Sequence, residues 1–236
     1  MTVRIVEIIS RSEQGITRPF LCRGEDGRQY FVKGGGAGRR ALISEWLAGQ
    51  IGLHLGLPIP NFQQMIISRE IVEFSAREDI QELGAGTGFG SQLVENTDEL
   101  AYLFIEQIDP KLRAKVLLYD WWVHNGDRTL SAEGGNPNLL WVHHDHRLYV
   151  IDHNLAFSED GYFWDQHIFR ESRAMWTQEF IAEMEPVMGT ALGQLAQWWG
   201  ELPDEWLEVD TGLTLEVVRR LLSRYEDSSG IFWRAT

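Results

Sequence analysis

The feature that most constrains the fold of this sequence is a change in its hydrophobic periodicity. Apolar and polar residues alternate through VRIVEII, PFLCRG and RQYFVK in residues 1–33, and this pattern predicts antiparallel strands joined by tight turns. The next segment, ALISEWLAGQIGLHLGLPIP, has apolar residues three and four apart and predicts one helix of roughly 17 residues that ends near Gly56. Further strands are expected at NFQQMIIS, REIVEF and GTGFGSQLVE.

Beyond the last of these strands the pattern becomes mainly helical. Thr97 is a candidate N-cap, and so is Asp109, which stands directly before a proline. The segment LLWVHHDHRLYVID predicts a hairpin that turns at Asp145. The expected helices cover about 98–107, 110–124, 176–200 and 214–226. A strand-rich first part and a helix-rich remainder predict an α+β fold with two lobes, residues 1–95 and residues 96–236.

Acidic residues outnumber basic ones, with 35 Asp and Glu against 21 Lys and Arg and a formal net charge of −14. Such a surface repels the phosphates of nucleic acids and anionic lipids, so neither nucleic acid nor a membrane is expected as a direct partner. No apolar run reaches the roughly 18 residues of a membrane span, and the N-terminal segment lacks the apolar centre of a secretory signal. A cytoplasmic protein is therefore expected. Cys22 is the only cysteine, which excludes an intrachain disulfide and a thiolate metal cluster.

Near the first predicted helix, Lys33 is a candidate for binding phosphate groups and Glu45 is a candidate partner for it. Phosphoryl transfer requires a cation on the donor phosphates, oxygen ligands for Mg²⁺ and a carboxylate that orients the acceptor hydroxyl. Lys33 ends the strand RQYFVK directly before a glycine-rich turn, and Glu45 on the following helix could pair with it and fix its direction. The alternative interpretation is a surface lysine and a solvated helix carboxylate.

Three further polar residues flank the predicted hairpin. Asp127 lies in the loop NGDR, Asn138 opens the strand NLLW, and Asp152 closes YVID. An aspartate after LYVI is costly to bury unless it binds a metal or is fully hydrogen-bonded, whereas Asp127 alone also fits an ordinary turn. Two carboxylates and an amide oxygen at the loop edges of one hairpin suit Mg²⁺. Asn136, in the same NPN sequence, competes with Asn138 as the amide ligand.

Two glycine-rich segments need a separate interpretation. GGGAGRR lacks the lysine and hydroxyl residue that end a P-loop, and neither it nor GAGTGFG has the spacing of a dinucleotide-binding loop. Both are expected to be flexible connectors or lid elements.

The segment DWWVHNGDRTLSAEGGNPNLLWVHHDHRLYVIDHNLAF resembles the catalytic core of HipA-like kinases, which is related to that of the phosphatidylinositol kinases. EDGRQYFVKGG resembles the family's lysine strand, SEWLAGQIGLHLGLPIP its following helix, and FGSQLV the segment that leads toward the lobe junction. The similarity covers most of residues 15–157. It implies a two-lobed, protein-kinase-like fold with a small strand-rich N-lobe and a larger helical C-lobe.

The resemblance also implies roles for single residues. Asp127 resembles the catalytic-loop aspartate, Asn138 the metal-binding asparagine and Asp152 the aspartate that binds the second metal position. Lys33 would steady the α and β phosphates of ATP. Arg128 would either hold the catalytic loop in place or meet a phosphate. The loop is longer than the family's compact pattern, and LSAEGG is the expected insertion.

The nucleotide side of the implied site includes further residues. The loop SRSEQGIT stands where a kinase covers its nucleotide phosphates, and it offers Gly15 and the hydroxyl of Thr17. Gly90, within FGSQLV, and Glu45 complete the predicted ATP-binding set. The resemblance allows phosphorylation of the loop itself, at Ser10 or Ser12.

The function implied is an ATP- and Mg²⁺-dependent phosphotransferase that acts on a protein serine or threonine hydroxyl. The resemblance allows membership in a toxin–antitoxin pair, with an antitoxin-like regulator as partner. Three alternatives remain open: a kinase for a small alcohol, sugar or lipid headgroup; a pseudokinase that binds nucleotide or a partner without turnover; and a metal-dependent hydrolase that uses the same carboxylates.

Overall fold

The protein, seen in a computed structural model that describes residues 2–12, 18–158 and 164–234, mixes strands and helices. Its chain divides into two compact units, each built from separate stretches. The first unit contains Met1–Trp46, Pro60–Glu95 and Leu202–Gly212. The second unit contains Leu47–Ile59, Asn96–Glu201 and Leu213–Thr236. Helix α1 (Arg39–His54) confirms the helix predicted after the first strands. The division between the two units falls inside this helix.

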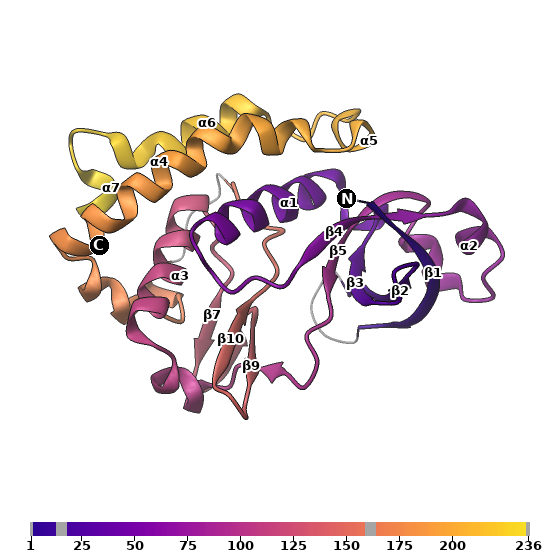
Figure 1. Cartoon of the computed structure of the whole chain (residues 1–236), viewed down its shortest axis with the longest axis horizontal. Coiled ribbons are helices and arrows are strands. Elements are labelled where there is room, and N and C mark those ends of the chain that lie inside the picture. The colour runs from indigo at the N-terminus through magenta and orange to yellow at the C-terminus, as the bar shows by residue number, and fades with distance from the viewer. Residues whose placement is uncertain (1, 13–17, 159–163, 235–236) are drawn as a thin grey trace. The chain divides into compact units, whose positions relative to one another are not determined.

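The first unit is built on a closed five-stranded barrel with the strand order β1-β2-β3-β5-β4 (Figure 1). All neighbouring strands are antiparallel except β1 and β4, which pair in parallel. The alternating apolar residues of these strands fill the barrel, where Cys22, Val32 and Met65 are fully buried. The strands are β1 (Thr2–Arg11), β2 (Phe20–Gly24), β3 (Gln29–Lys33), β4 (Phe62–Ile67) and β5 (Gly86–Gln92), and all five confirm predicted ones.

The prediction of a strand at REIVEF is wrong, because this segment forms the short helix α2 (Arg69–Glu73). The hydroxyl of Ser68 caps the helix by accepting a hydrogen bond from the backbone N–H of Ile71 at 3.3 Å. Only Val72 of the helix is buried. The cap and this single inward residue outweigh the β-branched residues that suggested a strand.

The glycine-rich segments are ordered parts of the first unit, which corrects the expectation of flexible connectors. Gly35–Ala37 forms the 3₁₀ turn η1, and the N–H of Gly35 donates to the carbonyl of Leu83, just beyond η2 (Glu78–Glu82), at 2.8 Å. A Cβ atom at Gly34 would lie 1.9 Å from that carbonyl oxygen, so close backbone packing requires glycine there. GAGTGFG mostly forms the start of β5.

Helix α3 (Pro110–Val123) lies in the second unit and confirms the helix predicted from the Asp109 cap. The carboxylate of Asp109 accepts a hydrogen bond from the N–H of Leu112 at 2.8 Å. The helix expected over 98–107 is wrong. The segment forms the short strand β6 (Asp98–Glu99) and the 3₁₀ helix η3 (Tyr102–Gln107). Pairing of β6 with β9 decides its conformation and overrides the local cap signal at Thr97.

The predicted hairpin is present as β9 (Leu139–Val142) and β10 (Arg147–Val150), in an antiparallel register that pairs Leu139 with Val150. The LSAEGG insertion forms a second small hairpin of β7 (Thr129–Ser131) and β8 (Gly134–Asn136). The segment expected to be an insertion therefore has its own local structure between the end of α3 and β9.

The rest of the second unit is helical, as expected from the apolar spacing. Its elements are η4 (Trp164–Gln166), η5 (Arg170–Met175), α4 (Gln178–Gly200), α6 (Leu215–Leu222), η6 (Ser223–Glu226) and α7 (Ile231–Arg234). The short helix α5 (Asp204–Leu207) belongs to the first unit. Within the described residues, no helix combines the length and the apolar character that a bilayer crossing needs.

Candidate active site

Lys33 and Glu45 form a buried ion pair in the first unit. The Nζ atom of Lys33, at the end of β3, lies 2.5 Å from Oε1 of Glu45 on α1. The side chains are only 8% and 2% exposed, so the predicted pairing is present and the surface interpretation of both residues is wrong. A buried lysine held by a helix glutamate has a fixed direction, which a phosphate-binding cation requires.

Gly90 has a structural reason to be glycine. It lies in β5 opposite Val32, and a Cβ atom there would come within 2.4 Å of Cγ of Met65 inside the barrel. Packing of Met65 therefore accounts for this glycine without a nucleotide. Gly15 and Thr17 lie outside the described residues, and their nucleotide-binding roles stay predictions.

In the second unit, the end of α3 leads into the loop that carries Asp127. His124 ends the helix in the left-handed conformation, with φ of 55°. Asn138 Nδ2 donates to Oδ2 of Asp127 at 2.8 Å, and Asn136 Nδ2 lies 3.4 Å from the same oxygen. Asn138 is 7% exposed, whereas Asn136 is exposed. Among the described residues, none forms a hydrogen bond with the buried Oδ1 of Asp127.

Asn138 and Asp152 stand at the same end of the β9–β10 hairpin. The N–H of Ile151 donates to the carbonyl of Asn138 at 3.1 Å, which ties the two strand ends together. Asn138 and Asp152 both have positive φ angles, 47° and 56°. Asparagine and aspartate tolerate this left-handed conformation better than other non-glycine residues. Next to Asp152, the buried His153 lies 3.1 Å from the hydroxyl of Tyr119 through its Nδ1 atom.

The pKa of Asp127 is raised from its ordinary value of 3.8 to about 6. Burial is the largest cause, and the negative charges of Asp152 and Asp120 act in the same direction. The charge of Arg128 and the hydrogen bond from Asn138 oppose the rise. A carboxylate with a pKa just below neutral is suited to accepting a proton from a hydroxyl group.

The oxygens at this hairpin end fit a hard cation. Asn138 uses its amide nitrogen on Asp127, which leaves its amide oxygen for a metal; the carboxylate of Asp152 is a second donor, and Asp127 has a buried oxygen without a partner. Carboxylate and amide oxygens are the donors that Mg²⁺ prefers. The described residues include no group of three or more His, Cys, Asp and Glu that could hold a metal, so the fit rests on this mixed set.

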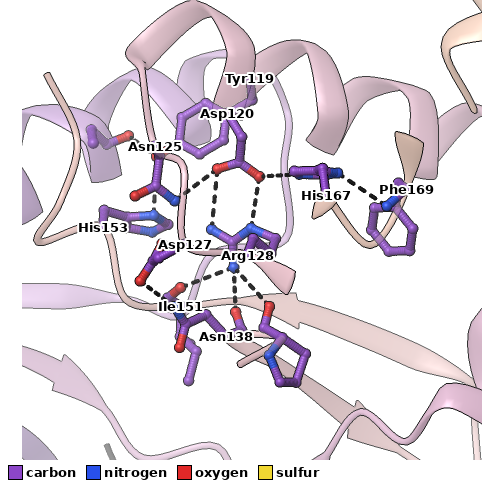
Figure 2. A network of polar contacts seen from close by, with 12 residues as sticks. Tyr119, Asp120, Asn125, Asp127, Arg128, Asn138, Ile151, His153, His167 and Phe169 are labelled. Carbon is purple, nitrogen blue, oxygen red and sulfur yellow. Dashed lines mark hydrogen bonds and ion pairs between the residues drawn. The ribbon is translucent and has the colours of Figure 1, made fainter. Parts of the chain in front are cut away.

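A buried polar network connects α3 with the backbone of these residues, as Figure 2 shows. Asp120 of α3 and Arg128 are both 0% exposed, and Nε of Arg128 lies 2.7 Å from Oδ2 of Asp120. Nη1 of Arg128 faces the backbone carbonyls of Pro137 at 3.3 Å and Ile151 at 3.2 Å, and it donates to that of Asn138.

Residues 5–236, nearly the whole chain, match the HipA-like kinase family. The chain belongs to this family. A search of curated proteins found no match. Membership makes this HipA-like kinase a phosphotransferase in general terms, and kinases as a class use a nucleotide and a metal.

Burial distinguishes between the two roles that the sequence leaves open for Arg128 in this HipA-like kinase. Its guanidinium is fully buried and donates to protein oxygens on both sides. These contacts favour holding the loop over meeting a phosphate.

The sequence interpretation missed Asp120 and His167. Nε2 of His167 lies 3.0 Å from Oδ2 of Asp120, and both side chains are buried. The sequence does single out Asp120, because a carboxylate inside the apolar run VLLYDWWV of α3 is costly to bury without a partner. The same argument identified Asp152 after LYVI. No sequence pattern singles out His167, since its partner Asp120 is far away in the sequence.

Proposed function

We propose that this HipA-like kinase transfers the γ-phosphoryl group of ATP, with Mg²⁺, to a serine or threonine hydroxyl of a protein. One observation carries the proposal, namely the surroundings of Asp127. It accepts a hydrogen bond from Asn138 at 2.8 Å, burial and the charge of Asp152 raise its pKa, and no described residue bonds to its buried Oδ1. These are the types of residue that the reaction needs as base and metal ligands.

Each residue has a proposed task in the transfer. Lys33, directed by Glu45, binds the α and β phosphates. Asn138 and Asp152 hold Mg²⁺, which would neutralise charge on the phosphate oxygens. Asp127 orients the acceptor hydroxyl and takes its proton while the hydroxyl oxygen bonds to the γ phosphorus and ADP leaves.

The arrangement of the molecule and its partners belong to the same proposal. The family's kinase-like fold suggests an N-lobe of residues 1–95 and a C-lobe of residues 96–236. The acceptor is a protein, and an antitoxin-like protein would regulate the activity. Gly15 and Thr17 would cover the nucleotide phosphates.

The test compares the wild type with Asp127→Asn. Each purified protein is incubated with γ-labelled ATP, Mg²⁺ and a heat-treated cell extract that supplies acceptors. Loss of the proton acceptor is expected to reduce labelling by about 100-fold or more. Asp145→Asn, on the turn of the β9–β10 hairpin, is the matched control and should label as the wild type does.

Equal labelling by the wild type and Asp127→Asn would refute the role of Asp127. Label that appears only in the low-mass fraction would move the acceptor from proteins to small molecules. Thermal stabilisation by ATP without any transfer would make the chain a nucleotide-binding module instead of an enzyme.

A further inference from the structure

The ion pair between Asp120 and Arg128 is unusual because both partners are completely buried. The guanidinium contacts both carboxylate oxygens, with Nε 2.7 Å from Oδ2 and Nη2 3.3 Å from Oδ1. Fork-to-fork geometry of this kind fixes the orientation of the arginine as well as its position. Since the desolvation of two charges offsets most of their attraction, stability alone does not account for the pair.

The other edge of the guanidinium reaches the backbone of the proposed metal site. Nη1 of Arg128 lies 3.2 Å from the carbonyl oxygen of Ile151, which directly precedes Asp152. The same nitrogen donates to the carbonyl of Asn138 and lies 3.3 Å from that of Pro137. One nitrogen therefore joins the two chain segments that carry Asn138 and Asp152.

These two segments have backbone conformations that need support. Asn138 and Asp152 have φ angles of 47° and 56°, a region that asparagine and aspartate tolerate better than other non-glycine residues but at some energetic cost, so contacts to their backbone help to hold them there. The carbonyl of Asn138 itself and that of Ile151 are the atoms that Arg128 contacts. Arg128 is thus placed to maintain the direction of both metal-binding side chains.

Asp120 is in turn held by two further donors. The backbone N–H of Phe169 donates to Nδ1 of His167 at 3.0 Å, so Nδ1 is an acceptor and Nε2 carries the proton. Nε2 then donates to Oδ2 of Asp120 at 3.0 Å, and Nδ2 of Asn125 donates to Oδ1 at 2.9 Å (Figure 2). Each oxygen of the Asp120 carboxylate therefore has a second donor besides Arg128, and these two donors fix its orientation.

We infer that Asp120 and His167 are positioning residues for the metal site: they orient Arg128, and Arg128 sets the direction of Asn138 and Asp152. The inference rests on the proposed function, because it assumes that these two residues hold Mg²⁺. It assigns Asp120 and His167 an effect on metal affinity that acts only through Arg128.

The test measures metal binding directly in the full-length protein. Mn²⁺ replaces Mg²⁺ as the probe, and a non-hydrolysable ATP analogue is present. The concentration of free Mn²⁺ is measured by electron paramagnetic resonance. His167→Leu removes the donor to Asp120, whereas His167→Gln keeps an N–H in its place. Thermal unfolding of each variant is followed separately by circular dichroism.

His167→Leu is expected to weaken Mn²⁺ affinity by about 10-fold, the usual effect of losing support behind a metal ligand. His167→Gln should stay within about 3-fold of the wild type, because its amide restores the hydrogen bond. The matched control is His143→Leu, since His143 also pairs with a carboxylate, Asp98 at 3.1 Å, but on the exposed hairpin. This control should bind Mn²⁺ as the wild type does.

A second variant covers the case in which His167→Leu does not fold. Asn125→Ala removes the bond to the other oxygen of Asp120, and it also removes the Asn125 Oδ1 atom, which is buried without a partner. It is expected to weaken Mn²⁺ binding in the same direction.

Wild-type affinity in the folded variants, or equal losses in His167→Leu and His167→Gln, would overturn the inference while the proposed function stands. Failure of the wild type itself to bind Mn²⁺ with the nucleotide would instead refute the proposed metal site.

Discussion

At the scale of the residue, the pKa values of two aspartates in this site are shifted in opposite directions, downward for Asp120 and upward for Asp127. Burial raises the pKa of both Asp120 and Asp127. In Asp120 the charge of Arg128 and the contact with His167 outweigh burial and lower the pKa to about 2, whereas Asp127 has a pKa of about 6. Environments that separate two carboxylates in this way provide a permanent anion and a proton acceptor side by side.

Asp120 makes the stability of the protein depend on acid pH. Because its folded-state pKa of about 2 lies below its ordinary value of 3.8, its contribution is present above pH 4 and is lost as pH falls toward 2. We predict that the free energy of unfolding of the wild type, relative to Asp120→Asn, falls by about 1 kcal/mol between pH 5 and pH 3. Urea unfolding of both proteins at the two pH values measures this. A constant or growing difference would contradict the prediction.

The sequence predicts the proposed base and metal ligands better than the residues that support them. Asp127, Asn138 and Asp152 could be found because each is a polar residue at the boundary of an apolar segment. The supporting contacts could not be found in this way. The carbonyls of Pro137 and Ile151 meet Arg128, and His167 meets Asp120, only through tertiary structure.

At the scale of the element, local signals succeeded where packing agreed with them. The Asp109 cap and the apolar spacing of α3 predict a helix that is also buried along most of its length. The Thr97 signal was overridden by pairing of β6 with β9, and REIVEF is too short for its β-branched residues to outweigh the Ser68 cap. Short segments depend on contacts that a sequence pattern does not contain.

Substitution of Gly90 tests how tightly the barrel strand β5 packs against Met65. A methyl group there would meet Cγ of Met65 at 2.4 Å and Sδ at 2.8 Å, so Gly90→Ala is expected to lower the free energy of unfolding by about 1–3 kcal/mol. Phosphoryl transfer per folded molecule should remain, because the clash lies inside the barrel. Urea unfolding and the labelling assay measure both quantities.

The matched control for Gly90→Ala is Gly193→Ala in α4, where a Cβ atom would meet nothing within 4 Å. This exposed helical position should gain stability by about 0.5–1 kcal/mol. A loss of stability at Gly193 equal to that at Gly90 would show that barrel packing is not the cause.

At the scale of the whole molecule, the first unit is completed by a segment from far along the chain. Leu202–Gly212 belongs to it, although the neighbouring helices α4 and α6 belong to the second unit. Nε1 of the fully buried Trp206 donates to the carbonyl of Thr87 at 2.8 Å, and Glu205 accepts from the N–H of Thr87. No local pattern could predict this, since residues 201–213 lie between the helices predicted over 176–200 and 214–226.

Trp206→Ala is expected to lower the free energy of unfolding by about 3–5 kcal/mol, because it empties a large buried volume and leaves the Thr87 carbonyl without its donor. Trp199→Ala, at a half-buried position of α4, should cost clearly less. Chemical denaturation of the two variants measures the difference. Equal losses would contradict the role of Trp206 in completing the first unit.

The position of the label shows whether this HipA-like kinase transfers the γ-phosphoryl group of ATP. The wild type is incubated with Mg²⁺ and acceptor proteins in two parallel reactions, one with γ-labelled and one with α-labelled ATP. We predict label on protein from the γ phosphate alone, and none from either reaction with Asp127→Asn. Label from the α phosphate, or equal labelling by Asp127→Asn, would contradict the account.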